Sequence, residues 1–260
     1  MESETAFREI ISLLLEADPQ NRNLRRIVGT VCRKYRLGSV PRHSDILACA
    51  TEQEKEILVP FLRVKPSRTL SGVAPVAVMT SPSPCPHGKC IPCPGGPDHP
   101  YQSPQSYTGG EPAARRAFIH GFDPYEQTAA RLSQFEQLGH HIDKAELIIM
   151  GGTMTAREDR YQEWFTTRCI SAMNEYRSGG VCRSVPDRGT DLSRETFQTP
   201  VLPPDGITGH PLAPGEQEAV YAANELSRVR CVAITFETRP DWCTAGHIDR
   251  MLTLGVTKVE

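Results

Sequence analysis

The sequence lacks the features that would place the protein in a membrane or outside the cell. Its 260 residues contain no run of eighteen apolar residues, such as a membrane-spanning helix would need. The first ten residues, MESETAFREI, have neither the basic nor the apolar segment of a secretory signal. The nine cysteines are an odd number, which argues against a framework of disulfides. We therefore expect a soluble, cytoplasmic protein in which some thiols bind a metal or take part in catalysis.

A large excess of charge is also lacking, because 29 basic and 31 acidic residues leave a formal net charge of -2. The chain as a whole therefore has no electrostatic attraction to nucleic acid. With 38% hydrophobic and 23% charged residues, the composition is nevertheless that of a folded chain with a substantial core. We expect one large domain with a smaller appendage.

Residues 19–44 depart from this balance, because they contain no acidic residue. Apolar residues at helical spacing predict a helix with a buried face, and Gly38 is its expected C-cap. The residues of that face are Leu24, Ile27, Val31 and Tyr35. The basic residues of the stretch are Arg22, Arg25, Arg26, Arg33, Lys34, Arg36 and Arg42. They form either an ordinary solvated helix face or a surface for the phosphates of RNA.

A second helix is expected after Thr51, where the letters TEQE form a capping box. Its apolar residues, which should be buried, are Ile57, Leu58, Phe61 and Leu62. The stretch KPSRTLSG that follows adds Lys65 and Arg68 in a link containing glycine and serine. These residues extend the basic segment to the end of a small helical region.

From Gly72 onward, strand-like and helix-like patterns alternate along the chain. This rhythm predicts an α/β sheet or barrel with parallel strands, in which reactive groups gather at the carboxyl ends of the strands. The cysteine-rich loop, Gly151–Gly152 and Glu237–Arg239 all fall at such ends. The expected strands are 73–80, 144–152 and 230–238, with a last apolar stretch at 255–260, and the expected helices are 124–138, 158–176 and 241–254.

Residues 177–214 interrupt this rhythm, because they show no sustained period and are rich in proline, glycine, serine and threonine. We interpret them as an exposed and mobile insertion. Cys182, which lies inside the insertion, is given no role.

Three cysteines occur together in SPCPHGKCIPCPGGP (83–97), at Cys85, Cys90 and Cys93. A polar, proline-rich loop does not bury inert thiols, so these residues are expected to bind a metal. Zinc would need a fourth ligand, which His87 or His99 could supply. Three thiols without a fourth fit better with a 4Fe-4S cluster whose remaining iron is open to S-adenosylmethionine, although zinc stays an alternative.

Five motifs in order resemble the catalytic subunit of Elongator in its free-standing archaeal or bacterial form. The resemblance runs from about Arg25 to the last residue, apart from residues 177–214. The motifs are KPSRTLSGVAPVAVMT, CPHGKCIPCPGGPD, QSYTGGEP, LGHHIDKAELIIMGGTM and FETRPDWC. Pro92 is a departure, since the family commonly has an aromatic residue before the third cysteine.

The resemblance implies a radical S-adenosylmethionine enzyme that forms 5-carboxymethyluridine at the wobble position of tRNA from acetyl-CoA. The cluster ligands would be Cys85, Cys90 and Cys93, and Lys144 would contact acetyl-CoA, although spacing alone suggests a surface lysine. The family's basic N-terminal segment binds tRNA, which here implies the basic residues Arg25, Arg26, Arg33, Lys34, Arg36, Lys65 and Arg68. The alternative function is a zinc-stabilised RNA-binding module without redox chemistry.

The strand ends supply further candidates for cofactor binding. Gly151 and Gly152 could let the backbone approach the amino group of S-adenosylmethionine, or they could form a simple turn. Glu237 and Arg239 could contact the same ligand, or they could pair with each other as part of the scaffold. Three residues after the cysteine loop could touch cofactor or RNA, namely Gln105, Ser106 and Tyr107.

The expected organisation is a helical, tRNA-binding segment at residues 1–72 and a partial radical S-adenosylmethionine (βα) barrel at residues 73–260. The family's C-terminal acetyltransferase-like domain is expected to be absent, and the chain would then be an incomplete enzyme with little turnover on its own. An incomplete barrel would leave an unpaired strand edge.

Overall fold

The computed structural model describes residues 2–18, 23–98, 102–177, 203, 205–208 and 210–260. The chain forms two compact units, one made of residues 1–71 and 134–141, the other of residues 72–133 and 142–260. Most of the predicted insertion, including Cys182, lies outside the described residues. None of the helices in the described ranges is both long and apolar enough to cross a membrane.

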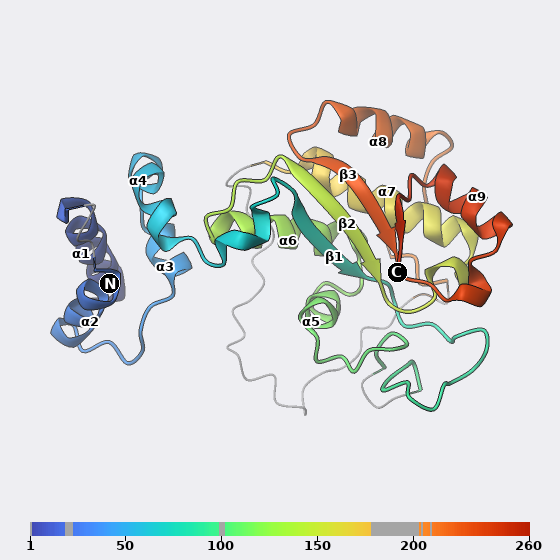
Figure 1. The fold of residues 1–260 in the computed structure, drawn as a ribbon, viewed down its shortest axis with the longest axis horizontal. Helices are drawn as coiled ribbons and strands as arrows, with labels where there is room; N and C mark the ends of the chain where they lie inside the picture. Colours follow the sequence, from blue (N-terminus) through green and yellow to red (C-terminus); the bar gives the residue numbers. More distant parts are fainter. Residues whose placement is uncertain (1, 19–22, 99–101, 178–202, 204, 209) are drawn as a thin grey trace. The chain divides into compact units, whose positions relative to one another are not determined.

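The first unit is built from four α-helices and a short 3-10 helix (Figure 1). Their bounds are Glu2–Glu16 (α1), Leu24–Lys34 (α2), His43–Ala48 (α3), Glu52–Leu62 (α4) and Pro66–Thr69 (η1). The core forms because each helix contributes an apolar stripe, such as Ala6, Ile10 and Leu14 of α1, which repeat every four residues. Val28 and Val31 of α2 and Leu58 and Leu62 of α4 complete it.

Two details of the predicted helices are wrong. Helix α2 ends at Lys34 with Tyr35 as its C-cap, and the chain reverses at Arg36, whose φ is +49°, so Gly38 does not cap the helix. In α4, Ile57 and Phe61 are 51% and 40% exposed instead of buried.

The capping box of α4 is confirmed. The Glu54 backbone N–H donates to Thr51 Oγ1, and the Thr51 N–H donates to the Glu54 carboxylate. Arg8 of α1 also donates two hydrogen bonds to this carboxylate, at 2.7 and 2.9 Å. Glu54 therefore joins the N-terminus of α4 to α1, and the Arg8 guanidinium is the main reason that its pKa falls to about 2.

The second unit contains one sheet of four parallel strands in the order β1-β2-β3-β4 (Figure 1). The strands are Ala74–Met79, Lys144–Met150, Arg230–Phe236 and Lys258–Val259. The helices are Pro112–Ile119 (α5), Pro124–Gln137 (α6), Asp159–Glu175 (α7), Glu216–Glu225 (α8) and Ala245–Thr253 (α9), with 3-10 turns at Met154–Ala156 (η2) and Pro240–Trp242 (η3). The predicted α/β class with parallel pairing is confirmed.

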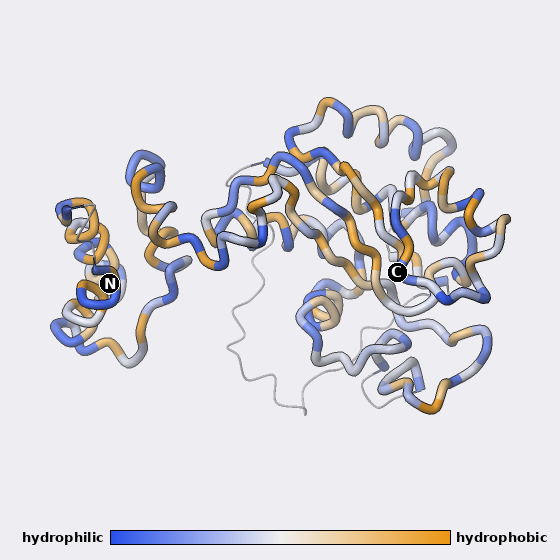
Figure 2. The backbone as a smooth tube through the Cα atoms, viewed as in Figure 1, coloured by the Kyte–Doolittle hydropathy of each residue, from blue (hydrophilic) through white to orange (hydrophobic). Residues whose placement is uncertain are grey.

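Side chains alternate across the sheet, and one face is more deeply buried than the other. Val76 of β1 lies beside Leu147 of β2, which lies beside Ile234 of β3, and all three are buried. Helices α6 and α7 lie behind the strands in Figure 1, and the strands are among the most hydrophobic stretches of this unit in Figure 2. The order of strands brings the segments after β1, β2 and β3 to one end of the sheet.

The outer edge of β1 is covered by two side chains instead of another strand. Gln127 of α6 accepts a hydrogen bond from the Met79 N–H at 2.9 Å and donates one to the Met79 carbonyl at 3.0 Å. The buried guanidinium of Arg116 in α5 donates to the carbonyl of Ala77. These contacts satisfy backbone groups that an unpaired strand edge would leave without partners.

Candidate active site at the carboxyl ends of the strands

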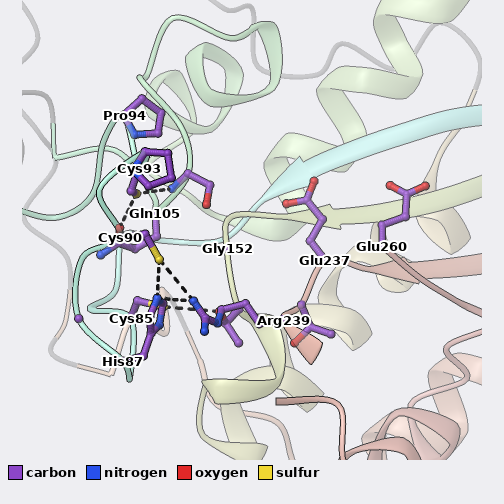
Figure 3. A pocket seen from close by; sticks show the side chains of 15 residues that line it. Cys85, His87, Cys90, Cys93, Pro94, Gln105, Gly152, Glu237, Arg239 and Glu260 are labelled. Carbon is purple, nitrogen blue, oxygen red and sulfur yellow. Dashed lines mark hydrogen bonds between the residues drawn. The ribbon is translucent and has the colours of Figure 1, made fainter. Parts of the chain in front are cut away.

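A pocket of about 560 Å³ opens where the loops after β1, β2 and β3 meet (Figure 3). The β1 loop contributes Cys85, Cys90 and Cys93, the β2 loop contributes Gly152, and the β3 loop contributes Glu237 and Arg239. Gln105 and Ser106 also line the pocket, as the motif after the cysteine loop suggested. The structure therefore brings together most of the residues predicted for cluster and cofactor binding.

The three thiols lie around this pocket, and all of them are free. Cys85 Sγ is 2.8 Å from His87 Nδ1, and His87 Nε2 is 2.8 Å from Cys90 Sγ, so one imidazole bridges two thiols (Figure 3). Cys93 instead contacts Gln105 Oε1 at 3.0 Å and the Ser106 N–H at 3.3 Å. Within the described ranges, no three metal-ligating side chains are gathered as a preformed metal site.

Arg239 stands beside the imidazole and one of the thiols. Its guanidinium contacts His87 Nε2 and lies 3.5 Å from Cys90 Sγ, and it is held by two hydrogen bonds to Asp241, at 2.9 and 3.0 Å. The bond to Asp241 is the main reason that the pKa of Arg239 is raised. Arg239 therefore does not pair with Glu237, and this alternative from the sequence is wrong.

Glu237 is held by groups from two other segments. Its carboxylate accepts a hydrogen bond from the Tyr107 hydroxyl, with oxygen–oxygen distances of 2.5 and 2.6 Å, and another from the Gly151 N–H at 3.2 Å. Burial raises the pKa of Glu237, while these hydrogen bonds oppose the shift. Burial and the neighbouring carboxylate also raise the pKa of Tyr107 far above its ordinary value.

Gly151 has a geometric reason to be glycine. Its φ is +122°, and a Cβ atom at this position would lie 2.2 Å from Thr80 Oγ1. Without a side chain, Gly151 can lie against Thr80 while its N–H donates to Glu237. Gly152, the next residue, lines the pocket. The pair therefore acts as more than a simple turn.

The end of the cysteine loop is closely packed on residues 103–107. A Cβ on Gly95 would lie 1.7 Å from the Tyr107 carbonyl oxygen, so only glycine fits there. Ser103 Oγ accepts from the Gly96 N–H at 3.2 Å and donates to the same carbonyl at 2.5 Å. Ser103 was missed by the sequence reasoning, although the paired glycines of CPGGP signalled a close backbone approach.

Lys144 lies at the other end of the sheet from the pocket. It is the first residue of β2, and the pocket begins after the last residue, Met150. At about 3.3 Å per residue, the strand separates the two residues by about 20 Å. The structure therefore does not bring Lys144 to the cysteines.

The residues predicted to bind tRNA all lie in the first unit, outside the pocket. Lys34 forms an ion pair with Glu9 of α1 at 2.7 Å, so the idea that the basic segment has no compensating carboxylate is wrong for this residue. The other predicted contacts are exposed and form no ion pair with any described residue, namely Arg25, Arg26, Arg33, Arg36, Lys65 and Arg68.

Comparisons with known proteins agree with the resemblance seen in the sequence. A family model described as the ELP3 N-terminal domain matches residues 3–70. The chain is 45% identical to a tRNA uridine(34) acetyltransferase of Methanocaldococcus infernus, covering 99% of this chain and 43% of that protein. It is 38% identical to Elongator complex protein 3 of Drosophila melanogaster, covering 97% of this chain and 41% of that protein.

Among solved structures, the Methanocaldococcus infernus Elp3 with an N-terminal deletion (1-46) is 36% identical, with a TM-score of 0.42, over 72% of this chain and 28% of that one. The chain spans about two fifths of the length of the curated relatives that it matches. Because the identity to those relatives extends over nearly the whole chain, the chain belongs to the family of Elongator complex protein 3 and the archaeal tRNA uridine(34) acetyltransferases.

Proposed function

We propose that this chain provides the tRNA-binding and radical S-adenosylmethionine portions of an enzyme that modifies the wobble uridine of tRNA. The product would be 5-carboxymethyluridine, with acetyl-CoA as the source of the added carbons, and the site of action would be the cytoplasm. Relatives named tRNA uridine(34) acetyltransferase support the substrate class. The observation that carries the proposal is the position of three free thiols around one pocket at the carboxyl ends of parallel strands.

The residues around the pocket fit a 4Fe-4S cluster held by Cys85, Cys90 and Cys93. The pocket has no fourth cysteine among its described lining residues, and the present partners of the thiols are an imidazole, an amide, a guanidinium and a backbone N–H, which can be exchanged for iron. Such a cluster with one open iron would supply the electron that cleaves S-adenosylmethionine to a 5'-deoxyadenosyl radical.

The chain's own residues would shape the space beside the cluster. Gly152 has no side chain to block the pocket, and Glu237 offers a carboxylate whose direction is fixed by Tyr107. Arg239 places a positive charge 3.5 Å from Cys90 Sγ, at the side of the pocket where the substrate would bind. These groups would bind and orient S-adenosylmethionine and exclude water from it.

The exposed basic residues of the first unit would bind the tRNA backbone. Arg25, Arg26 and Arg33 lie in α2, and Arg36 follows it. Lys65 directly precedes η1, and Arg68 lies in it. Because they form no ion pair with any described residue, their charges are available for phosphates. Lys144, at the opposite end of the sheet, would contact acetyl-CoA at a place separate from the thiols.

The decisive experiment is anaerobic reconstitution with iron and sulfide. We expect a brown protein that bleaches with dithionite and forms 5'-deoxyadenosine from S-adenosylmethionine. Cys90→Ala should lose both properties, whereas Cys243→Ala, outside the pocket lining, should keep them.

The competing function, a zinc-stabilised RNA-binding module, is favoured by the contact of His87 with two of the thiols. A colourless protein that holds one zinc ion through Cys85, Cys90, Cys93 and His87, and that makes no 5'-deoxyadenosine, would establish this alternative and refute the proposal.

A further inference from the structure

A short segment at the end of the predicted insertion, residues 205–208, is packed into the second unit. Gly206 and Ile207 are buried, and Ile207 is 8% exposed. For these residues the predicted exposure of the insertion is wrong. Burial of residues in such a stretch requires specific contacts with the rest of the second unit.

Both ends of the segment are attached to the beginnings of helices. Asp205 forms an ion pair with Arg160 in the first turn of α7. Thr208 Oγ1 donates to Asp123 Oδ2 at 2.9 Å, and the other oxygen of Asp123 accepts from the Glu126 N–H in the first turn of α6. The segment is therefore held from two helices, with Gly206 between the two attachments.

Gly206 presses its backbone against two side chains, with a φ of +73°. A Cβ atom at this position would lie 2.6 Å from both Arg157 Nη2 and Ser81 Oγ, and 3.2 Å from the ring of Tyr161. Real Cβ atoms do not approach other atoms so closely, so any larger residue would displace Arg157 or Ser81. Glycine is needed here for space as well as for backbone conformation.

Ser81 lies at the start of the cysteine loop, two residues after the end of β1, and its side chain is almost fully buried. Its carbonyl accepts from Arg157 Nη1 at 2.9 Å, its N–H donates to the Tyr161 hydroxyl at 3.1 Å, and its hydroxyl contacts Arg157 Nη2 at 3.1 Å. The Arg157 guanidinium also stacks on Tyr161, 3.7 Å from the ring centre. Three contacts thus fix the point from which the loop leaves β1.

A shift at Ser81 would be transmitted to the first cysteine. Pro82 and Pro84 restrict the backbone between Ser81 and Cys85, because proline fixes its own φ and limits the residue before it. Cys85 Sγ lies only 3.6 Å from Thr153 Oγ1 and 2.8 Å from His87 Nδ1, so a small displacement would change both contacts.

We propose that Gly206 is a positioning residue for the cysteine loop: by packing against Arg157 and Ser81, it fixes the place of Cys85 relative to Cys90 and Cys93. The role does not require a particular metal, since it is a property of the loop before any metal binds. It rests on the proposed function only in the assumption that the three thiols act together.

The test compares Gly206→Ala with Gly215→Ala in the metal-free protein. Both glycines have left-handed backbones, with φ of +73° and +77°, but a Cβ on Gly215 would meet nothing within 4 Å. The two variants therefore share the backbone strain and differ in the contact with Arg157 and Ser81. The measurement is the rate of iodoacetamide alkylation of each cysteine, followed by peptide mass spectrometry, and then the iron bound after reconstitution.

We expect Gly206→Ala to raise the alkylation rate of Cys85 severalfold and to lower the iron bound per chain, while Gly215→Ala changes neither. Cys169 is fully buried and reports general unfolding, so its rate should stay low in both variants. An unchanged Cys85 rate in Gly206→Ala, or an equal rise in Gly215→Ala, would overturn the proposal.

If Gly206→Ala exposes Cys169 as well, Arg157→Lys decides the question, because lysine keeps the charge but cannot reproduce the paired contacts with Ser81. A rise in the alkylation rate of Cys85 but not of Cys169 in Arg157→Lys then supports the proposal, and an unchanged rate for Cys85 refutes it. Failure of the proposed function gives a different result, in which the wild-type chain takes up no 4Fe-4S cluster although Cys85 still responds selectively to Gly206→Ala.

Discussion

The Tyr107 hydroxyl and the Glu237 carboxylate are joined by a hydrogen bond across 130 residues of sequence. Tyr107 follows the cysteine loop, Glu237 follows β3, and Gly151 after β2 donates to the same carboxylate. Since Gly95 and Ser103 attach the cysteine loop to the Tyr107 backbone, this one carboxylate connects all three segments that surround the pocket. Its environment should therefore control both the stability of the second unit and the shape of the site.

Tyr107→Phe should destabilise the protein by about 1–3 kcal/mol, because it leaves a buried carboxylate without its strongest donor. The free energy of unfolding from urea titrations measures this effect. Tyr125→Phe is a matched control, since the Tyr125 hydroxyl also donates to a carboxylate, Glu175, at 2.7 Å, but in a more exposed place. Its effect should be below about 1 kcal/mol. Equal effects of the two substitutions would show that Glu237 does not need Tyr107.

The free energy of unfolding should depend on pH in part through the ionisation of Glu237. Burial raises the pKa of this carboxyl in the folded protein, so the folded state holds the proton more tightly than the unfolded state does. The contribution of Glu237 to the free energy of unfolding is therefore fully present below the ordinary pKa of a carboxyl group. It is lost as the pH rises through the pKa that Glu237 has in the folded protein. Glu237→Gln removes this loss, so the stability of the variant relative to wild type should increase from pH 4 towards pH 7. A difference in the free energy of unfolding between the variant and wild type that stays constant with pH would contradict the raised pKa of Glu237.

The regular part of the fold could be predicted because the hydrophobic pattern is local. The buried residues Ala145, Leu147 and Ile149 alternate in β2, and the strand leads to paired glycines. Helix α1 was equally open to prediction, since Ala6, Ile10 and Leu14 repeat every four residues. Lys34 has no acidic partner within residues 19–44, because its partner, Glu9, lies in α1.

The contacts that build the pocket could not be predicted, because no local pattern encodes them. The spacing of the cysteines indicated one loop, but it did not reveal that His87 would lie between two thiols while Cys93 turned to Gln105. The partner of Arg239 is two residues away, and it was missed because Glu237 is equally near in sequence. Asp241 lies in the 3-10 turn Pro240–Trp242, which begins directly after Arg239, whereas the Glu237 carboxylate is turned to Tyr107 and Gly151.

The salt dependence of tRNA binding should distinguish Arg33 from Lys34. The two residues are adjacent in α2, but Lys34 is paired with Glu9 while Arg33 forms no ion pair with any described residue. Arg33→Ala should weaken binding and reduce the slope of log K against log salt by about one, the value for one lost phosphate contact. Lys34→Ala should change the slope less, because its charge is already neutralised. Identical slopes for the two variants would show that Glu9 releases Lys34 on binding.

Lys144→Ala should separate acetyl-CoA binding from the chemistry of the cysteine pocket. Because β2 places Lys144 about 20 Å from the pocket, the variant should bind as much iron and cleave S-adenosylmethionine as fast as wild type does. Its affinity for acetyl-CoA, measured by calorimetry, should fall by roughly 10- to 150-fold if the lysine contacts a phosphate of the coenzyme, since a charged hydrogen bond contributes about 1.5–3 kcal/mol. Glu146→Gln on the same strand is the control and should leave both properties unchanged. Loss of iron in Lys144→Ala would mean that the two ends of the sheet are coupled, and unchanged affinity for acetyl-CoA would remove Lys144 from that site.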